Sequence, residues 1–261
     1  MPTEPSAGPP SLRVATFNIR TGRAPDGANA WPRRRRRTLE VTVELDADVM
    51  GLQEVLAGQR RWLARRLPDW EPWGSGRGRF GGGEQCPLVV RRSVATVLSH
   101  DTRWFGPDPG RAGQRLEGAR HPRIATTATL RVPGWPDDLV VTNVHLDATS
   151  AARRRRSVEQ LVGWLDMSQP QVVLGDLNAE PADEPLAILA DAGLRSVLAP
   201  DAGGTFHGFT GRTDGARIDH ICINDRLTAE RARVRHAPDL HPWPSDHWPV
   251  VVDLKPATPT S

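Results

Sequence analysis

The segment Gln171-Val172-Val173-Leu174-Gly175-Asp176-Leu177-Asn178 decides the fold of this 261-residue chain. Residues 171–174 form a short, mostly apolar run between Pro170 and Gly175, which predicts a buried strand. The polar residues Asp176 and Asn178 follow directly. Buried polar side chains cost free energy unless partners satisfy them. The segment therefore predicts a buried sheet with a polar site at the end of a strand.

Polar residues also end or interrupt other apolar runs along the chain. They are Asn18, Gln53-Glu54, Asn143 with His145, Asp219-His220 and Ser245-Asp246-His247. Any one alone is more typical of a turn or a solvated edge. Together they share one composition of carboxylates, amides and imidazoles, so we expect them to satisfy one another, or a metal, in one site. These hard oxygen and nitrogen ligands favour Mg²⁺ or Mn²⁺ over Zn²⁺.

The order of the predicted elements indicates a single α/β (α+β) domain. We expect strands at 12–19, 48–53, 88–97, 124–132, 139–146, 171–174, 218–223 and 248–254, and helices at 32–45, 59–67, 150–167 and 184–192. Several strands follow one another without a helix, which predicts mixed or antiparallel sheets. The domain is expected to span 12–255, between a disordered tail at 1–11 and a short tail at 256–261.

Composition and charge exclude several classes of protein. The chain is 38% hydrophobic and 25% charged, which is typical of a globular domain and not of a disordered or collagen-like chain. No apolar run reaches the length of a membrane span. Cys86 and Cys222 alone exclude a disulfide framework and a cysteine-based zinc site. The Pro/Ser-rich N-terminus does not read as a signal peptide, so we expect a cytoplasmic protein.

Two loops and two arginine runs leave alternatives open. The glycine-rich loop 74–83 lacks the Gly-Lys-Ser/Thr of a phosphate loop and is interpreted as a surface loop or as the rim of a site. A second long loop covers 106–122. The runs 33–37 and 153–156 fall on predicted helices, where consecutive side chains point about 100° apart. They are interpreted as solvated faces, with contact to nucleic acid phosphates as the alternative, and the net charge of +3 supports an anionic partner only weakly.

Six segments in this order resemble one known family, and together they span residues 12 to 254. They are Thr16-Phe17-Asn18-Ile19-Arg20, Leu52-Gln53-Glu54-Val55, Thr142-Asn143-Val144-His145-Leu146-Asp147, Gly175-Asp176-Leu177-Asn178, Arg217-Ile218-Asp219-His220-Ile221 and Ser245-Asp246-His247-Trp248-Pro249-Val250. The family is the endonuclease/exonuclease/phosphatase superfamily of DNase-, exonuclease III- and deadenylase-like metal-dependent phosphoesterases. The resemblance implies a four-layer sandwich of two mixed β-sheets flanked by helices.

The resemblance also implies a metal site and a water-activating group. Glu54 would bind Mg²⁺ (or Mn²⁺), helped by Asn18 and Asp246. The ion would polarise a phosphoryl oxygen and stabilise the leaving oxygen. Asp176 would orient or deprotonate the attacking water, and Asn178 would hold a phosphate oxygen.

Two imidazole–carboxylate pairs are implied on either side of the phosphate. His247 would contact the phosphate while Asp219 fixes its tautomer, because a neighbouring carboxylate favours the charged imidazole. His145 would flank the phosphate from the other side. Glu84 is the candidate partner of His145, as in DNase-like members of the family.

Three further residues have weaker assignments. Arg123 either binds phosphate or caps a strand, and His207 is a candidate for the substrate side. His220 points away from Asp219 in a regular strand and is interpreted as structural. The chain has no tyrosine. Since repair-type relatives place a tyrosine near the phosphate, this departure favours DNase, deadenylase and phosphatase types.

These observations predict a divalent-metal-dependent hydrolase of phosphate ester bonds. The favoured substrate is a nucleic acid or nucleotide-like phosphodiester, cleaved by in-line attack of water. One alternative is a phosphomonoesterase acting on a small or lipid-derived phosphate. A second is a non-catalytic nucleic-acid-binding module, which the full set of polar residues disfavours. The sequence specifies no oligomeric state.

Overall fold

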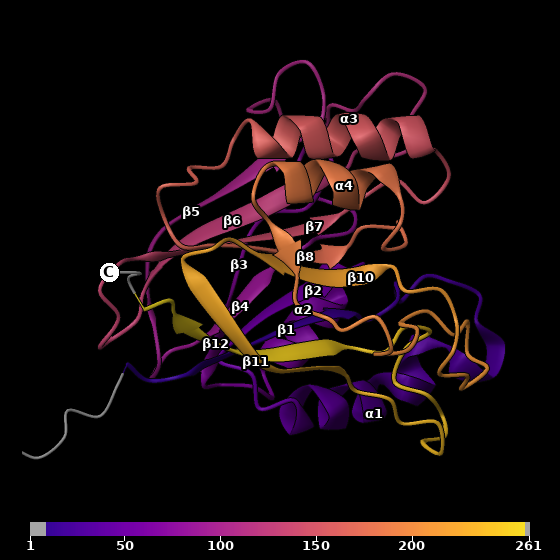
Figure 1. The fold of residues 1–261 in the computed structure, drawn as a ribbon. Coiled ribbons are helices and arrows are strands. Elements are labelled where there is room, and N and C mark those ends of the chain that lie inside the picture. Colours follow the sequence, from indigo (N-terminus) through magenta and orange to yellow (C-terminus); the bar gives the residue numbers. More distant parts are fainter. Residues whose placement is uncertain (1–8, 259–261) are drawn as a thin grey trace, which may run out of the picture.

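The computed structural model describes residues 9–258, which form four α-helices, a 3₁₀ helix and twelve strands (Figure 1). In chain order they are β1 (Leu12–Asn18), η1 (Gly27–Asn29), α1 (Trp31–Glu44), β2 (Val49–Gln53), α2 (Ala57–Ala64), β3 (Trp70–Trp73), β4 (Leu88–Arg91), β5 (Thr96–Trp104), β6 (Ile124–Arg131), β7 (Leu139–His145), α3 (Ala151–Val162), β8 (Gln171–Asp176), α4 (Glu184–Asp191), β9 (Arg195–Ser196), β10 (Asp219–Ile223), β11 (Leu227–Val234) and β12 (Val250–Pro256).

The strands form two six-stranded sheets, and both are mixed as predicted. The first has the order β11-β12-β1-β2-β4-β3, and the second has the order β5-β6-β7-β8-β10-β9. In the first sheet β1 and β2 are parallel, and in the second β7 and β8 are parallel, whereas the other pairs are antiparallel. The carboxyl ends of each parallel pair therefore lie at one edge of its sheet.

Four layers result, which confirms the predicted sandwich. Side chains from both sheets, such as Val14 and Leu174, form the central apolar cluster. A second cluster lies between the first sheet and helices α1 and α2, and a third lies between the second sheet and helices α3 and α4. In Figure 1, α1 covers one outer side and α3 with α4 covers the other. The central strands are apolar on both faces because both faces are buried.

Some element boundaries differ from the prediction. The apolar run 88–97 is two strands, because residues between Arg91 and Thr96 form a turn that sends β4 and β5 into different sheets. Strands β3, β9 and β11 were not predicted. Strand β3 contains Pro72, which is tolerated there because β3 is the edge of its sheet. Helix α3 ends at Val162, where Gly163 is the C-cap, and not at residue 167.

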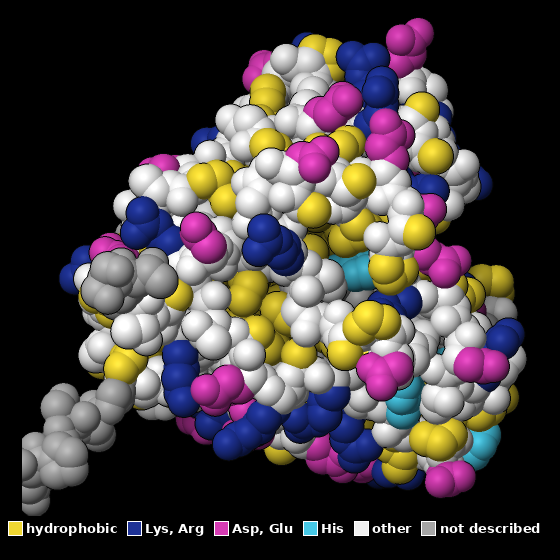
Figure 2. All heavy atoms as spheres, viewed as in Figure 1, with side chains coloured by type: hydrophobic (Ala, Val, Ile, Leu, Met, Phe, Trp, Pro, Cys, Tyr) yellow, Lys and Arg dark blue, Asp and Glu magenta, His cyan; other side chains and the backbone are white. Residues whose placement is uncertain are grey.

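The described part of the chain begins close to the first strand and has a surface of mixed charge. Strand β1 begins at Leu12, whereas residues 1–8 and 259–261 of the two predicted tails lie outside the described residues. Within residues 9–258, no helix combines the length and the apolar character needed to cross a membrane. Figure 2 shows basic and acidic side chains interspersed over the face that it presents, in keeping with the small net charge.

Candidate active site

The predicted polar residues meet where strands of the two sheets end. In the first sheet Asn18, the last residue of β1, is the register partner of Gln53 in β2. In the second sheet Asp176 is the register partner of both His145 in β7 and Asp219 in β10. Because β10 runs antiparallel to β8, its first residue meets the last residue of β8. Strand register thus brings residues far apart in sequence to one edge of the sandwich.

The backbone is unusual at these strand ends. Gly175 has a φ of +140°, and a Cβ there would lie 2.0 Å from the carbonyl oxygen of Val144. Only glycine fits this close approach of β8 to β7. Glu54 and Asn178 have φ values of 60° and 49°, which are uncommon for residues with side chains. Strained backbone of this kind clusters at functional sites, where the surrounding structure holds it in place.

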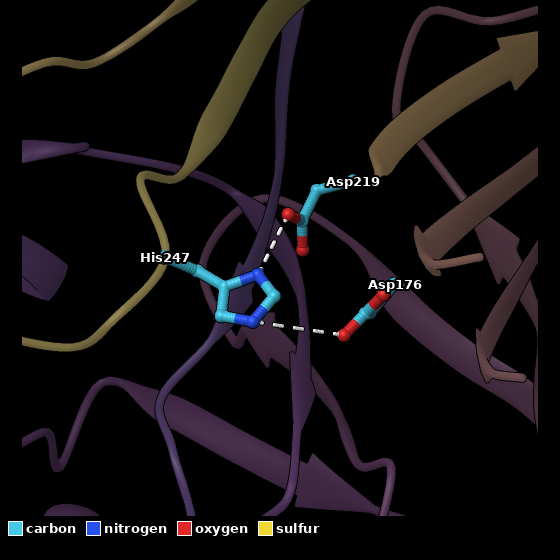
Figure 3. Close-up of side chains that lie close together, drawn as sticks. All are labelled: Asp176, Asp219 and His247. Atoms are coloured by element: carbon cyan, nitrogen blue, oxygen red, sulfur yellow. Dashed lines mark hydrogen bonds and ion pairs between the residues drawn. The ribbon is translucent and has the colours of Figure 1, made fainter. Parts of the chain in front are cut away.

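The imidazole of His247 lies between two buried carboxylates (Figure 3). Its Nδ1 is hydrogen-bonded to Oδ2 of Asp219 at 2.8 Å, and its Nε2 lies 3.9 Å from Oδ2 of Asp176. Burial disfavours the charged imidazole, but the charge and hydrogen bond of Asp219 outweigh it and raise the pKa of His247 to about 10. The predicted pair of Asp219 and His247 is present, and its imidazole is cationic at neutral pH.

Asp176 is the carboxylate on which the other polar groups converge. Its Oδ2 accepts a hydrogen bond of 2.9 Å from Nδ2 of Asn18 and lies 3.5 Å from Nε2 of His145. Its Oδ1 accepts a hydrogen bond from the backbone N–H of Asn178 at 3.0 Å. Burial and the nearby charge of Asp219 raise the pKa of Asp176 to about 7. Asp176 therefore has the position and the basicity to take a proton from a bound water.

Asn18 connects the remaining carboxylates to Asp176. Its Nδ2 also donates to Oε1 of Glu54 at 3.2 Å, and its carbonyl oxygen accepts a hydrogen bond of 2.6 Å from Oγ of Ser245. Oγ of Ser245 also lies 3.2 Å from Oδ1 of Asp246. The side-chain amide of Asn18 thus bridges the carboxylates of Glu54 and Asp176, whereas Asp246 is connected to the backbone of Asn18 through Ser245. Oxygen donors of this type fit Mg²⁺ or Mn²⁺.

A second arrangement of possible metal ligands overlaps with this one. Single ligand atoms of Asp176, Asp219 and His247 lie within 4.8 Å of one another. The imidazole is less suited to a hard cation, because its Nδ1 is engaged by Asp219 and its raised pKa keeps it protonated. The oxygen donors of Glu54 and Asp176, which Asn18 bridges, are therefore chemically better suited to Mg²⁺ or Mn²⁺, and this pair shares Asp176 with the imidazole group.

The predicted pair of Glu84 and His145 is wrong. Glu84 instead forms an ion pair with Arg77, whose Nη1 lies 2.7 Å from Oε2. His145 contacts Asp176, and burial together with the charges of Arg123 and Arg77 holds its pKa well below the usual value. Arg77 lies in the glycine-rich loop and pairs with Glu84, the carboxylate that the family pattern assigns to His145. His145 is therefore neutral, unlike His247.

Arg123 and His207 lie in different surroundings. Arg123 is half-buried within electrostatic range of His145, and its Nη1 has no hydrogen-bond partner in the described part of the chain. His207 is 2% exposed and stacks on Trp248 with ring centroids 3.9 Å apart. Burial lowers the pKa of His207 to about 4. This packing gives His207 a supporting position, whereas Arg123 is within electrostatic range of His145.

Three polar residues that the sequence grouped with the site have structural contacts instead. Nε2 of Gln53 donates to Oδ1 of Asn143 at 2.7 Å, which links the two sheets within the core. Asn143 also donates to the carbonyl oxygens of Leu52 and Pro87. Nε2 of His220 is hydrogen-bonded to the carbonyl oxygen of Ala179, on the side away from Asp219, as predicted.

Arg34 shows that the predicted solvated face of the run 33–37 is wrong at one position. Its side chain is fully buried and donates to the carbonyl oxygens of Ile19, Arg20, Asn29 and Pro244. These bonds tie helix α1 to the segments on either side of the site. The burial of Arg34 could not be predicted from the run of five basic residues, because nothing in the sequence pattern distinguishes one arginine from its neighbours.

Arg20 and Phe206 are further neighbours of the site that the sequence left unassigned. Nη1 of Arg20 lies 3.4 Å from Oδ2 of Asp246, and its Nη2 donates to Asp26. Burial disfavours the guanidinium charge, but Asp26 and Asp246 outweigh it and raise the pKa of Arg20. Phe206 is partly exposed and contacts the edge of the His247 imidazole, with ring centroids 5.0 Å apart. Both lie in segments that were singled out, at Thr16–Arg20 and beside His207.

Comparisons with known proteins agree with this geometry. The model of the Endonuclease/Exonuclease/phosphatase family matches residues 15–247. A structure of the endonuclease/exonuclease/phosphatase from Bacteroides vulgatus is 28% identical, with a TM-score of 0.87 over 95% of this chain and 100% of that chain. The mannosyl-6-phosphatase Bt3783 from Bacteroides thetaiotaomicron is 23% identical, with a TM-score of 0.84 over 94% of this chain and 100% of that chain.

A structure with lower sequence identity has the same fold. TDP2 of D. rerio, complexed with a single-strand DNA product, is 14% identical, with a TM-score of 0.73 over 94% of this chain and 99% of that chain. Identities below a quarter establish a shared fold and no shared substrate. No curated protein matches the chain significantly.

Proposed function

Since the chain belongs to the endonuclease/exonuclease/phosphatase family of phosphoester-hydrolysing enzymes, we propose that it hydrolyses a phosphodiester with the help of a divalent cation. The observation that carries the proposal is the convergence of Asp219, His247 and Asp176 beside the oxygen cluster around Asn18. This arrangement offers a cationic group, a base and a set of metal ligands at one place.

Each group has a defined part in the proposed reaction. Glu54, Asn18 and Asp246 would hold Mg²⁺ or Mn²⁺, which when bound supplies charge stabilisation at the phosphoryl and leaving oxygens. Asp176 orients the attacking water and accepts its proton, and Asn178 contacts a phosphate oxygen. The charged His247 binds a phosphate oxygen while Asp219 fixes the imidazole.

A diester is favoured by the charge of the catalytic group itself. His247 is the cationic side chain in contact with Asp176, and its imidazole partner across the site, His145, is neutral. A phosphodiester carries one negative charge, whereas a monoester carries up to two at neutral pH. Within residues 9–258, His247 is the one cationic side chain within 4.0 Å of Asp176, and together with a metal ion it matches the smaller charge. Nucleic acids and nucleotide-like diesters are the proposed substrates.

The test is hydrolysis of bis-p-nitrophenyl phosphate with Mg²⁺, with Mn²⁺ and with EDTA. We expect metal-dependent turnover, and a loss of at least about 100-fold in Glu54→Ala, because that carboxylate would be a metal ligand. The matched control is Glu159→Ala, an exposed glutamate on α3. Turnover that ignores EDTA would refute the role of the metal. Faster hydrolysis of p-nitrophenyl phosphate than of the diester would refute the diester assignment.

A further inference from the structure

A group of basic side chains lies beside the catalytic residues, and no step of the proposed reaction uses it. We define the arginine patch as Arg77, Arg115, Arg120, His121 and Arg123. Arg77 belongs to the glycine-rich loop 74–83, and Arg123 directly precedes β6. The other members belong to the long loop 106–122. Arg115, Arg120 and His121 are exposed, whereas Arg77 and Arg123 are half-buried. The patch therefore extends from the interior of the site to the surface.

The two loops that carry the patch pack against each other. Nε1 of Trp104 donates to the carbonyl oxygen of Arg77 at 2.7 Å. A Cβ at Gly113 would lie 2.6 Å from the backbone nitrogen of Arg79, so the backbones of the two loops are in close contact. Nη1 of Arg115 donates to the carbonyl oxygen of Arg120 at 3.2 Å. These contacts place the arginines on one joint surface.

Most of the positive charge in the patch is not neutralised. Arg77 is paired with Glu84, and the nearby Asp147 is already paired with Arg153 at 2.8 Å. Within residues 9–258, none of the other three arginines of the patch lies within 4.0 Å of a carboxylate oxygen. The exposed Glu117, on the same loop, forms no ion pair with them there. Three guanidinium groups are thus available to an anion from outside.

The patch is continuous with the catalytic group. Arg123 directly precedes β6, which pairs antiparallel with β7, with Ala125 opposite Val144. The start of β6 therefore lies beside the end of β7, where His145 is the last residue. Nη1 of Arg123 is buried and has no hydrogen-bond partner among residues 9–258, so its donor is not satisfied there.

We propose that the arginine patch binds a second phosphate group of the substrate, next to the phosphate that is hydrolysed. The planar guanidinium group donates two parallel hydrogen bonds to phosphate oxygens, and several such groups on one surface select a phosphate over a neutral substituent. The inference rests on the proposed function and narrows its substrate class. The preferred substrate is a phosphodiester that carries an additional phosphate, either a terminal monoester or the next diester of a chain.

The kinetic test compares substrates that differ in one phosphate. The dinucleotides TpT and pTpT differ in the terminal phosphate, and the trinucleotide TpTpT supplies a second phosphate as a diester. We expect kcat/KM to be at least about tenfold higher with a second phosphate, through a lower KM and an unchanged kcat. A preference for pTpT over TpTpT identifies a terminal phosphate as the ligand, and a preference for TpTpT identifies a backbone phosphate. Equal rates show that the patch accepts either.

The matched variants separate the patch from the catalytic group. In Arg115→Gln/Arg120→Gln the preference is expected to fall to within about threefold, while hydrolysis of bis-p-nitrophenyl phosphate is unchanged. Arg36→Gln, at an exposed position on helix α1, should retain the full preference. A wild-type enzyme that turns over bis-p-nitrophenyl phosphate but shows no preference overturns this inference and leaves the proposed function standing. A preference that survives in the double variant also overturns it.

A binding measurement tests the patch without turnover. We expect inorganic pyrophosphate, titrated calorimetrically in the presence of EDTA, to bind the wild-type protein and Arg36→Gln with the same affinity. Binding to Arg115→Gln/Arg120→Gln should be at least about tenfold weaker and less dependent on salt. Equal affinity in all three proteins overturns the inference. If no phosphoester is hydrolysed at all, the proposed function fails, and this titration still decides the role of the patch.

Discussion

Replacing Asp219 by Asn removes the charge that keeps His247 protonated and preserves the shape of the side chain. In the wild-type protein Asp219 raises the pKa of His247 to about 10 against the opposing effect of burial. Without that charge, burial is opposed only by the weaker effects of Asp176 and Asp246, and the pKa should fall to about its ordinary value of 6.5 or below. At pH 8 the protonated fraction of His247 then drops from about 99% to about 3% or less, so kcat/KM should fall by at least about 30-fold.

The assay is the pH dependence of bis-p-nitrophenyl phosphate hydrolysis between pH 6 and pH 9, with saturating Mg²⁺ and samples quenched in alkali. The loss in Asp219→Asn should shrink as the pH falls toward 6, because the imidazole regains its proton. The control is Asp214→Asn, an exposed aspartate that pairs with Arg212. An unchanged pH profile in Asp219→Asn would refute the assignment of His247 as the cationic group.

The same pair also contributes to folding stability, with a defined dependence on pH. The pKa of His247 is raised in the folded state, so its contribution is fully present below about pH 6.5 and is lost as the pH rises through about 10. Urea denaturation of the wild-type protein at pH 6 and pH 9.5 should show this decline, and Asp219→Asn should show less of it.

Three further predictions concern residues that shape the site. Glu84→Gln should leave kcat within about threefold of wild type, since Glu84 is paired with Arg77 and not with His145. A 100-fold loss of kcat would instead support a pair of Glu84 with His145. Arg34→Gln should lower the free energy of unfolding in urea by about 3–4 kcal/mol, because four carbonyl oxygens lose their donor, and less than about 1 kcal/mol would contradict this. Gly175→Ala should cost about 3 kcal/mol in the same measurement, since its Cβ would meet the neighbouring strand at 2.0 Å; wild-type stability would show that the strands can separate.

The central strands and the ends that carry the site could be predicted from the sequence. Strands β1, β7 and β8 are buried on both faces, so they appear as continuous apolar runs whose ends are marked by polar residues. Asn18 and Asp176 could therefore be placed at strand ends. That these two residues lie close together could be predicted only from the family pattern, because their distance depends on how the strands pair and how the two sheets pack.

The features that the sequence did not predict depend on contacts between distant segments. Strand β11 carries exposed charged residues and lies at a sheet edge, so its apolar pattern is weak. Arg34 has the same residue type as its exposed neighbours, and only the packing of α1 against the site distinguishes it. The ion pair of Glu84 with Arg77 closes within a glycine-rich loop whose path no local pattern specifies.

The two histidines of the site show how such contacts determine chemistry. His145 and His247 are both buried, and both lie within 4.0 Å of the same carboxylate oxygen of Asp176. They differ in charge because their remaining neighbours differ: Asp219 stabilises the imidazolium of His247, whereas two arginines disfavour it at His145. One of these arginines comes from the loop that also takes Glu84 away from His145. Together with burial, the same loop therefore helps to keep His145 neutral, and it packs against the loop that carries unpaired arginines of the patch. A change in this loop is thus expected to alter substrate preference and the protonation of His145 together.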